Sequence, residues 1–297
     1  MKGKILFGYT LFLLYSHSAS AEWVEWIADS QFDYTYNDNI NQSAFTADEL
    51  DDHVFDLSFT GGRYFQINRD NADYTRLRLA VDVNLRAHDQ FDDLDHIKTG
   101  GSIALLHKFG LGRDAIRASL YSGAHYQWAS LSERNLATYE FGISVTKNVT
   151  ERLNLVLDFG YKIDDGSNAV RAEPDIASDV YDAERFVVTL GSSFLVTNDF
   201  QATLSYNYLN GDLLGNCTGD NVGEVFSRVN VKAHADDRVF GGCQYRFDGD
   251  AHTVTLGGNY AINNHAFVHL GSSYSRGGEN NLIYDTIQVN ANISYEF

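Results

Sequence analysis

Long runs of alternating apolar and polar residues recur along the chain. Between Thr75 and His88 every second residue is apolar, and the residues between are mostly charged or amide-bearing. The segments from Leu153 to Asp164 and from Ile287 to Phe297 repeat this pattern. Because successive side chains of a strand point to opposite faces of a sheet, a period of two predicts β-strands with one apolar and one polar face.

Noisier alternation in other segments raises the predicted number of strands to twelve, and two further candidates, 225–233 and 239–247, would raise it to fourteen. A soluble β-sandwich also alternates, but its strands average roughly 5 to 6 residues, whereas roughly 9 to 11 residues cross a bilayer. The longer runs here therefore favour membrane-spanning strands. The noisier segments are 30–38, 53–66, 97–109, 114–128, 137–147, 184–196, 200–209, 252–262 and 265–275.

The connectors between these segments alternate between short and long. Outer-membrane barrels have tight turns on the periplasmic side and longer loops outside. We therefore predict an all-β fold, a transmembrane antiparallel up-and-down β-barrel of 12 strands, with 14 possible. The short connectors are 68–73, 110–113, 148–151, 197–199 and 263–264, and the long ones are 39–52, 89–96, 129–136, 165–183, 210–223 and 276–282.

Residues 1–21 have the features of a secretory signal peptide. Lys2 and Lys4 precede a short apolar run, and Ala19 and Ala21 fit a signal-peptidase site. No apolar run after residue 21 approaches the roughly 20 residues that a membrane helix requires. We therefore expect a signal peptide over 1–21 and one outer-membrane β-barrel domain over 22–297.

The last five residues alternate and end on an aromatic ring, Phe297. This ending resembles the terminal signal of bacterial outer-membrane proteins, in which Tyr295 and Phe297 would form the membrane-insertion signal. The resemblance implies the outer membrane of a Gram-negative bacterium and insertion by the barrel assembly machinery. Outer-membrane lipid and lipopolysaccharide would then surround the barrel.

Residues 36–41 read Tyr-Asn-Asp-Asn-Ile-Asn. This stretch is similar to the first-strand exit of barrels in the surface lipoprotein assembly modifier family and in related exopolysaccharide exporters. The helical repeat domain that precedes such barrels is absent from this sequence. The resemblance is therefore limited to the barrel.

The chain is strongly acidic, with 40 Asp and Glu residues against 22 Lys and Arg and a formal net charge of −18. Nucleic acid is therefore excluded as a partner, because binding phosphates requires a cationic face. Many of the acidic residues fall in the long connectors, where solvation explains them best and bridging by divalent cations is the alternative. We expect no cofactor and no dedicated metal site.

The polar faces of the strands are expected to line a lumen of mixed charge. Two interpretations remain open: a channel that passes small hydrophilic solutes, or a narrow barrel plugged by salt bridges. The candidate lumen-lining residues are Arg76, Arg78, Asp82, Arg86, Arg117, Glu140, Asp158, Lys162 and Arg185. Asp56 is expected to face them.

The chain has two cysteines, Cys217 and Cys243. Export places them in an oxidising compartment, so a disulfide between them is the default expectation. With twelve strands both would lie in one long outer loop, whereas with fourteen Cys243 would lie on a strand. A bridge forms more easily in the first arrangement, so a disulfide would favour twelve strands.

The sequence contains no serine elbow and no His-Glu-x-x-His motif. A cluster of acidic and histidine residues lies near the predicted outer rim, where proteases of the omptin family place Asp and His residues, but a solvated acidic loop is the preferred interpretation. The cluster consists of His88, Asp89, Asp92, Asp93, Asp95 and His96. We therefore predict a protein that is not an enzyme. A passive channel is the leading hypothesis, a non-conducting barrel acting through its loops as an adhesin, receptor or secretion component is the alternative, and a hydrolase comes third.

Overall fold

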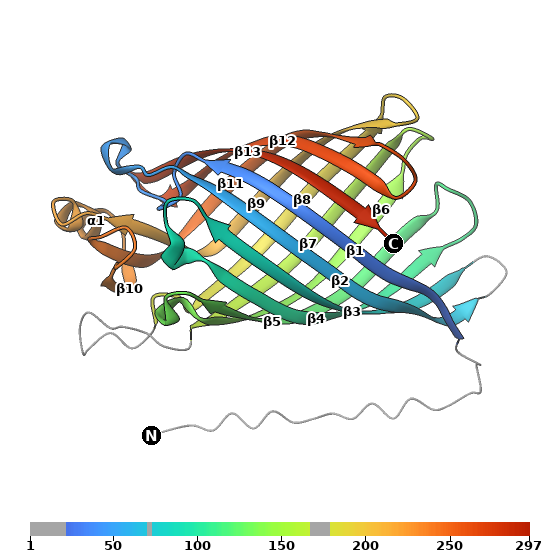
Figure 1. The fold of residues 1–297 in the computed structure, drawn as a ribbon, viewed down its shortest axis with the longest axis horizontal. Coiled ribbons are helices and arrows are strands. Elements are labelled where there is room, and N and C mark those ends of the chain that lie inside the picture. The colour runs from blue at the N-terminus through green and yellow to red at the C-terminus, as the bar shows by residue number, and fades with distance from the viewer. Residues whose placement is uncertain (1–21, 70–72, 167–178) are drawn as a thin grey trace, which may run out of the picture.

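A closed ring of twelve antiparallel strands forms the body of the molecule, with one extra strand outside the ring (Figure 1). The computed structural model describes residues 22–69, 73–166 and 179–297. The predicted signal peptide lies outside these residues. The ring strands are β1 (Glu22–Asn37), β2 (Asp52–Arg69), β3 (Tyr74–His88), β4 (His96–Phe109), β5 (Ile116–Ala129), β6 (Leu136–Asn148), β7 (Leu153–Gly166), β8 (Ala183–Leu195), β9 (Phe200–Cys217), β11 (Cys243–Ala261), β12 (Ala266–Glu279) and β13 (Leu282–Glu296).

Each ring strand pairs with the next ring strand along the chain, and β13 pairs with β1 to close the barrel. The closing register places Ile293 opposite Phe32. Both side chains are exposed on the outside, with 56% and 46% of their surface accessible. The apolar face of the last strand is thus continuous with that of the first, and the prediction of a closed up-and-down barrel is confirmed.

The outside of the ring is apolar along its whole circumference. Val81 on β3, Leu256 on β11 and Leu270 on β12 each expose more than 60% of their surface. Large exposed apolar patches on a protein mark an interaction surface, and a continuous apolar band around a closed barrel is the surface that faces lipid. The barrel is therefore a membrane-spanning one, and its place is the bacterial outer membrane.

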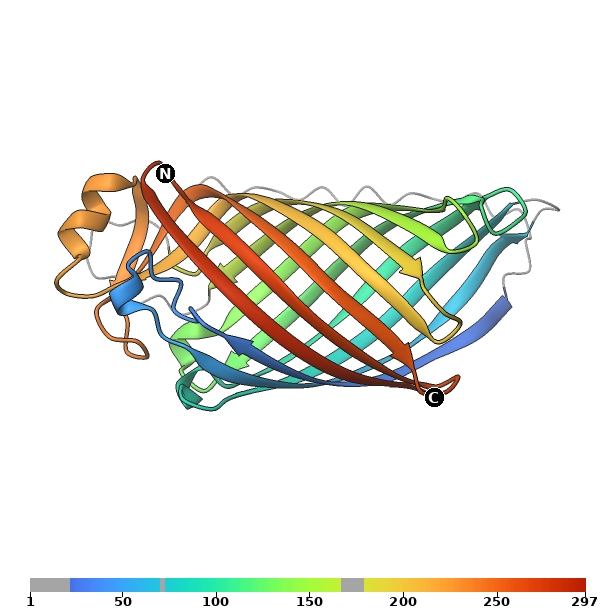
Figure 2. The ribbon, with the colours of Figure 1, turned by 90° about the horizontal axis from the view of Figure 1, so that it is seen from above.

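The two ends of the barrel differ (Figure 2). Short connections join β4 to β5, β6 to β7, β8 to β9 and β11 to β12 at the end that also holds Phe297. The opposite end holds the longer connections, three of which contain a short 3-10 turn: Thr46–Asp48, Asp92–Leu94 and Ser132–Arg134. By the length rule for these barrels, the first end is periplasmic and the second is the outer end.

Two predicted strands are wrong as ring members. The candidate 225–233 contains the end of helix α1 (Val222–Arg228) and the start of β10 (Val231–Asp236), the strand outside the ring. The candidate 239–247 runs into β11, which forms one strand with the predicted segment 252–262. The cause is that β9 and β11 stay paired beyond the rim, from Asp212 opposite Asp248 to Cys217 opposite Cys243.

The connector predicted at 276–282 is also shorter than expected. Strands β12 and β13 continue to Glu279 and from Leu282, so only two residues turn the chain. Asn280 takes a left-handed backbone conformation with φ of 53°, and a tight hairpin turn requires such a conformation. None of the helices among the described residues is long and apolar enough to cross a membrane.

Candidate functional site: lumen and outer mouth

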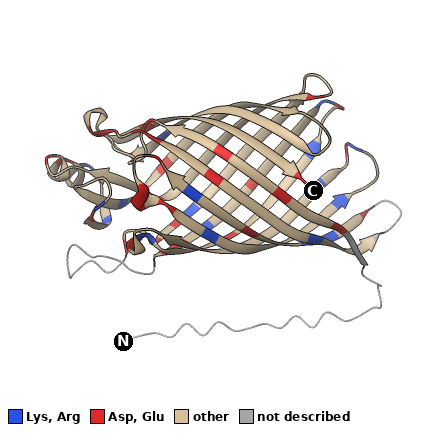
Figure 3. Cartoon of the chain, viewed as in Figure 1, with Lys and Arg blue, Asp and Glu red and all other residues tan. Residues whose placement is uncertain are grey.

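All of the predicted lumen-lining residues lie on the face opposite to the exposed apolar side chains. On β3, Leu79, Val81 and Val83 face outwards, so the positions between them face the lumen. The register of neighbouring strands extends this assignment around the ring. Figure 3 shows charged residues along these strands as well as in the connections.

Ion pairs of the lumen join residues on nearby strands. Arg86 donates from Nε to Asp56 Oδ1 at 2.8 Å and from Nη2 to Oδ2 at 3.0 Å. Strands β3 and β2 carry these two residues as direct partners. Nearer the periplasmic end, Arg76 lies 3.4 Å from Glu25 on β1, with β2 between them. Each of these carboxylates therefore neutralises a cation on the same part of the wall and not one on the opposite wall.

Two longer contacts cross an intervening strand at a glycine. His125 on β5 reaches Asp82 on β3, with Nε2 3.1 Å from Oδ1, and its ring lies over Gly100, where a Cβ atom would come within 2.2 Å of it. Tyr121 donates its hydroxyl to Asp158 at 2.9 Å across Gly142 in the same way. Glycine at these places lets a side chain lie flat along the wall. Both contacts thus run around the barrel and not through its centre.

Asp164 collects several donors near the outer rim. Its carboxylate accepts a hydrogen bond from Thr138 at 2.7 Å and from Arg185 at 2.9 Å, and Lys162 lies 3.3 Å away. Asp164 and Thr138 are both buried. The cluster again joins adjacent strands, β6, β7 and β8.

The wall formed by β9, β11, β12 and β13 carries a different set of side chains. Over residues 201–211, 251–261, 267–277 and 284–294, all of them described, the lumen-facing positions hold no Lys, Arg, Asp or Glu. Hydroxyl and amide groups predominate there, with His269 among them. Charge in the lumen is therefore concentrated on β1 to β8.

A cover, defined here as residues 213–247, lies across the outer mouth (Figures 1 and 2). It consists of the outer ends of β9 and β11, helix α1 and strand β10, which pairs with β11. Leu213, Tyr245 and Phe247 lie on the face that continues from the lumen. They are buried against Val225 of α1 and Leu282 of β13, so the cover has a hydrophobic core of its own.

The cover contacts every other outer connection. Asn216 forms an isolated β-bridge with Ser43 in the connection between β1 and β2. Phe240 packs edge-on against Phe91 in the connection between β3 and β4, with ring centroids 5.0 Å apart. Val180, before β8, packs against the cover residues Ala233 and Ala235. Arg228 donates to the carbonyl of Asn281 between β12 and β13 at 3.1 Å. Because the cover contacts connections on all sides of the outer mouth, it spans the mouth.

Arg134, between β5 and β6, makes the most extensive of these contacts. It donates to Asp237 at 3.1 and 3.3 Å and to Gln244 at 3.3 Å. The Asp237 side chain is almost fully buried, at 1% exposure. The guanidinium also lies 5.5 Å from the ring centroids of Tyr181 and Phe240. Burial raises the pKa of Tyr181 to about 12, with Asp237 adding to the rise and Arg134 opposing it, so the phenol stays neutral.

A closed ring with an apolar outside and a charged, hydroxyl-rich inside defines the class of protein. The chain has the fold of an outer-membrane β-barrel. No protein-family model and no curated protein sequence matches it.

Solved structures of similar architecture include an outer-membrane channel from Pseudomonas putida F1, with 9% identity, a TM-score of 0.49, and coverage of 92% of this chain and 97% of that one. An anion-selective porin from Comamonas acidovorans has 9% identity, a TM-score of 0.41, and coverage of 93% and 100%. The transport unit of an Escherichia coli autotransporter has 11% identity, a TM-score of 0.43, and coverage of 97% and 94%. At these values the likeness concerns the fold of the outer-membrane barrel alone.

A disulfide joins Cys217 to Cys243 at the far end of the cover, with Cα atoms 5.0 Å apart. The disulfide occurs together with twelve ring strands, as expected, but the expected loop position of the two cysteines is wrong, because they are direct partners on β9 and β11 beyond the rim. A bridge on paired strands needs no rearrangement of the backbone. The disulfide thus closes the chain segment that contains α1 and β10.

Replacing both cysteines with serine should loosen the cover and leave the ring intact. A disulfide that closes a loop with a sequence separation of 26 residues stabilises the folded state by about 3 kcal/mol in the chain-entropy model. Trypsin should therefore cleave the variant faster at Arg228, Lys232 or Arg238, measured by mass spectrometry of the refolded protein. Equal cleavage rates for both proteins, with the ring still heat-modifiable on gels, would contradict this role of the bridge.

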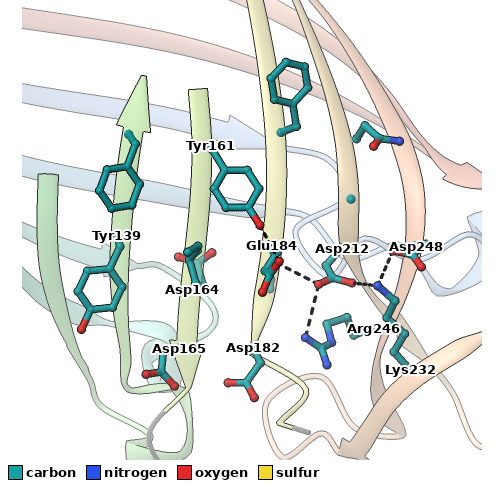
Figure 4. A pocket seen from close by; sticks show the side chains of 16 residues that line it. Tyr139, Tyr161, Asp164, Asp165, Asp182, Glu184, Asp212, Lys232, Arg246 and Asp248 are labelled. Carbon is teal, nitrogen blue, oxygen red and sulfur yellow. Dashed lines mark hydrogen bonds and ion pairs between the residues drawn. The ribbon is translucent and has the colours of Figure 1, made fainter. Parts of the chain in front are cut away.

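A hollow of about 1270 Å³ lies at the outer ends of β6 to β9, beside the base of the cover (Figure 4). Asp212 is its centre: it accepts hydrogen bonds from Lys232 at 2.7 Å and from the backbone of Glu184 at 3.0 Å. Lys232 also binds Asp248. Burial alone would lower the pKa of Lys232, but its hydrogen bonds to the two aspartates outweigh this and raise the pKa. The base of the cover is thus held by paired charges.

The rim histidines considered for hydrolysis serve structural contacts. The ring of His88 binds Asp52, with Nδ1 2.8 Å from Oδ2, and both side chains are buried. Asp95 accepts a hydrogen bond from the His88 backbone at 2.7 Å, and His96 Nδ1 lies 3.1 Å from the carbonyl of Leu94. These contacts tie the connection between β3 and β4 to the rim, and the His88 and Asp52 side chains are buried, whereas a solvated loop was predicted.

The Asn-rich stretch at residues 36–41 builds the first outer connection. Asn39 is buried, and its amide donates to the carbonyls of Ser43 and Asp285, each at 2.9 Å. Asn41 donates to Asp48 at 2.8 Å and accepts from Leu50 at 3.1 Å. Asn side chains therefore supply the backbone partners that a turn lacks. The similarity to the lipoprotein assembly family is not tested by these contacts.

Proposed function

We propose that this outer-membrane barrel is a passive channel for small hydrophilic solutes, with an outer opening narrowed by the cover. One observation carries the proposal: contacts between lumen-facing side chains run along the wall. Arg86 to Asp56, His125 to Asp82 and Tyr121 to Asp158 each join strands no more than two places apart. A barrel plugged by salt bridges would instead join opposite walls.

The width of the ring supports the same conclusion. Twelve strands spaced about 4.8 Å apart and tilted by about 40° enclose a backbone diameter of about 24 Å. Inward side chains from opposite walls do not meet across that distance. The lumen therefore has room for water along its axis, and the proposed mechanism is filtration without a chemical reaction.

Single-channel recording in a planar bilayer tests the proposal. The refolded protein should give steady, reproducible openings, and the reversal potential in a salt gradient should report the charge preference. The control is the same protein unfolded by heat before addition. A preparation that is folded, as judged by heat-modifiable migration on gels, and yet never conducts would contradict the channel.

A non-conducting barrel that acts through its outer connections is the second candidate. The observation in its favour is the cover, which contacts all the other outer connections and buries its own apolar core. Removal of the cover distinguishes the two functions. The channel predicts conductance in both forms, whereas a barrel closed by its cover predicts conductance only after removal.

A further inference from the structure

Two cations stand side by side at the periplasmic end of the lumen. Lys108 on β4 and Arg117 on β5 are direct partners in the sheet register. Within the described ranges, neither forms an ion pair with a carboxylate. Like charges directly opposite each other destabilise a sheet. The repulsion between Lys108 and Arg117 would be relieved by an anion bound between them.

The surroundings of the pair provide further donors and a bounded space. A hollow of about 180 Å³ is lined by Lys108 and Arg117 together with Tyr74, Ser119 and Thr146. Ser144 lines it as well, directly opposite Ser119 in the register of β5 and β6, and Thr146 is opposite Arg117. Hydroxyl groups therefore stand beside both cations.

A third cation near the hollow, Arg76, already forms an ion pair. Arg76 lies 3.4 Å from Glu25 and over the ring of Tyr74, with its guanidinium carbon 4.8 Å from the ring centroid. Lys108 approaches the same ring at 5.8 Å. Arg76 is therefore neutralised by Glu25, whereas no carboxylate among the described residues neutralises Lys108 or Arg117 in the hollow.

We propose that Lys108 and Arg117 form a binding site for one oxyanion group of a solute, a phosphate or a carboxylate, at the periplasmic exit of the lumen. An oxyanion is favoured because the planar guanidinium and the ammonium both donate charge-assisted hydrogen bonds to its oxygens, and neighbouring hydroxyls can complete its shell. The inference rests on the proposed channel for access from outside, and it narrows the solutes to anionic ones.

The test uses the refolded barrel, inorganic phosphate as the probe, and the double variant Lys108→Gln/Arg117→Gln. Phosphate binding is measured by titration calorimetry in detergent, and the permeability ratio of chloride to potassium is taken from reversal potentials. The double variant should bind phosphate at least tenfold more weakly and shift its preference towards cations. Both side chains face water, so the fold should be retained, and heat-modifiable migration verifies this.

The matched control is Lys147→Gln/Arg152→Gln, which removes the same two charges from exposed positions near the same end. It should leave phosphate binding unchanged. Equal losses in the two variants, or unchanged binding in Lys108→Gln/Arg117→Gln, would overturn the site. A wild-type barrel that conducts but binds no phosphate would overturn the site and leave the channel standing. A barrel that binds phosphate through this pair but never conducts would refute the channel and leave the site.

Discussion

Replacing the cover, residues 213–247, by Asn-Gly should raise the single-channel conductance several-fold. The replacement joins Asp212 to Asp248, which are direct partners on β9 and β11, and two residues of this type form the tight turn that a hairpin needs. Strands β9 and β11 lose only their paired ends beyond Asp212 and Asp248, and the other ring strands keep their pairing partners. Because the cover contacts connections on all sides of the mouth, its removal should widen the outer opening of the proposed channel.

The measurement is the distribution of conductance steps in planar bilayers, with the wild-type protein recorded under the same salt. Reduction of the disulfide provides a milder version of the change and should increase the frequency of large openings without altering the ring. An unchanged conductance in a truncated barrel that remains heat-modifiable would show that the cover does not limit passage.

Replacing Arg134 with methionine should release the tip of the cover. The change leaves the Asp237 carboxylate buried without its cation, a situation that costs about 3 to 5 kcal/mol when one partner of a buried pair is removed. The loss falls on the closed position of the cover and not on the ring. Backbone amides of Val239 and Phe240, which donate to Asp237, should therefore exchange hydrogen faster, as measured by mass spectrometry.

Arg238→Gln is the matched control for this experiment. Arg238 pairs with Glu133 at 2.9 Å, between the same two segments, but its side chain is 64% exposed. Exposed pairs contribute about 0 to 1 kcal/mol, so this variant should exchange almost like the wild type. Similar protection in the Arg134 variant and the wild type would mean that the apolar core of the cover holds it without the arginine.

The ring could be predicted from the sequence because a period of two assigns each side chain to a face without knowledge of its partners. The lumen-facing positions of Arg76, Arg86 and Asp158 follow from that rule. Their partners do not, because they depend on the register between strands: Arg86 meets Asp56, and Asp158 meets a tyrosine, Tyr121. Sequence alone therefore left open whether the charges plug the lumen.

The cover could not be predicted from alternation. Leu213, Tyr245 and Phe247 continue the lumen-facing positions of β9 and β11, yet they are apolar and buried in a separate core beyond the rim. The only signal was the pair of cysteines, since a bridge between them requires the two segments to lie together. Lys108 was missed for a simpler reason: it shares its face with Lys98 in the segment 97–109, but the alternation there is noisier than on β3.

In the proposed channel, the uneven placement of charge around the lumen would give dipolar molecules a preferred orientation. Ionised groups lie on β1 to β8, whereas β9, β11, β12 and β13 present hydroxyls and amides between the rims. A field from one wall, in a space bounded by a low-dielectric shell, extends across the lumen. A solute with a charged and an uncharged end would point its charged end towards β1 to β8 and lie perpendicular to the barrel axis. Its rotation and its translation along the axis would then be coupled.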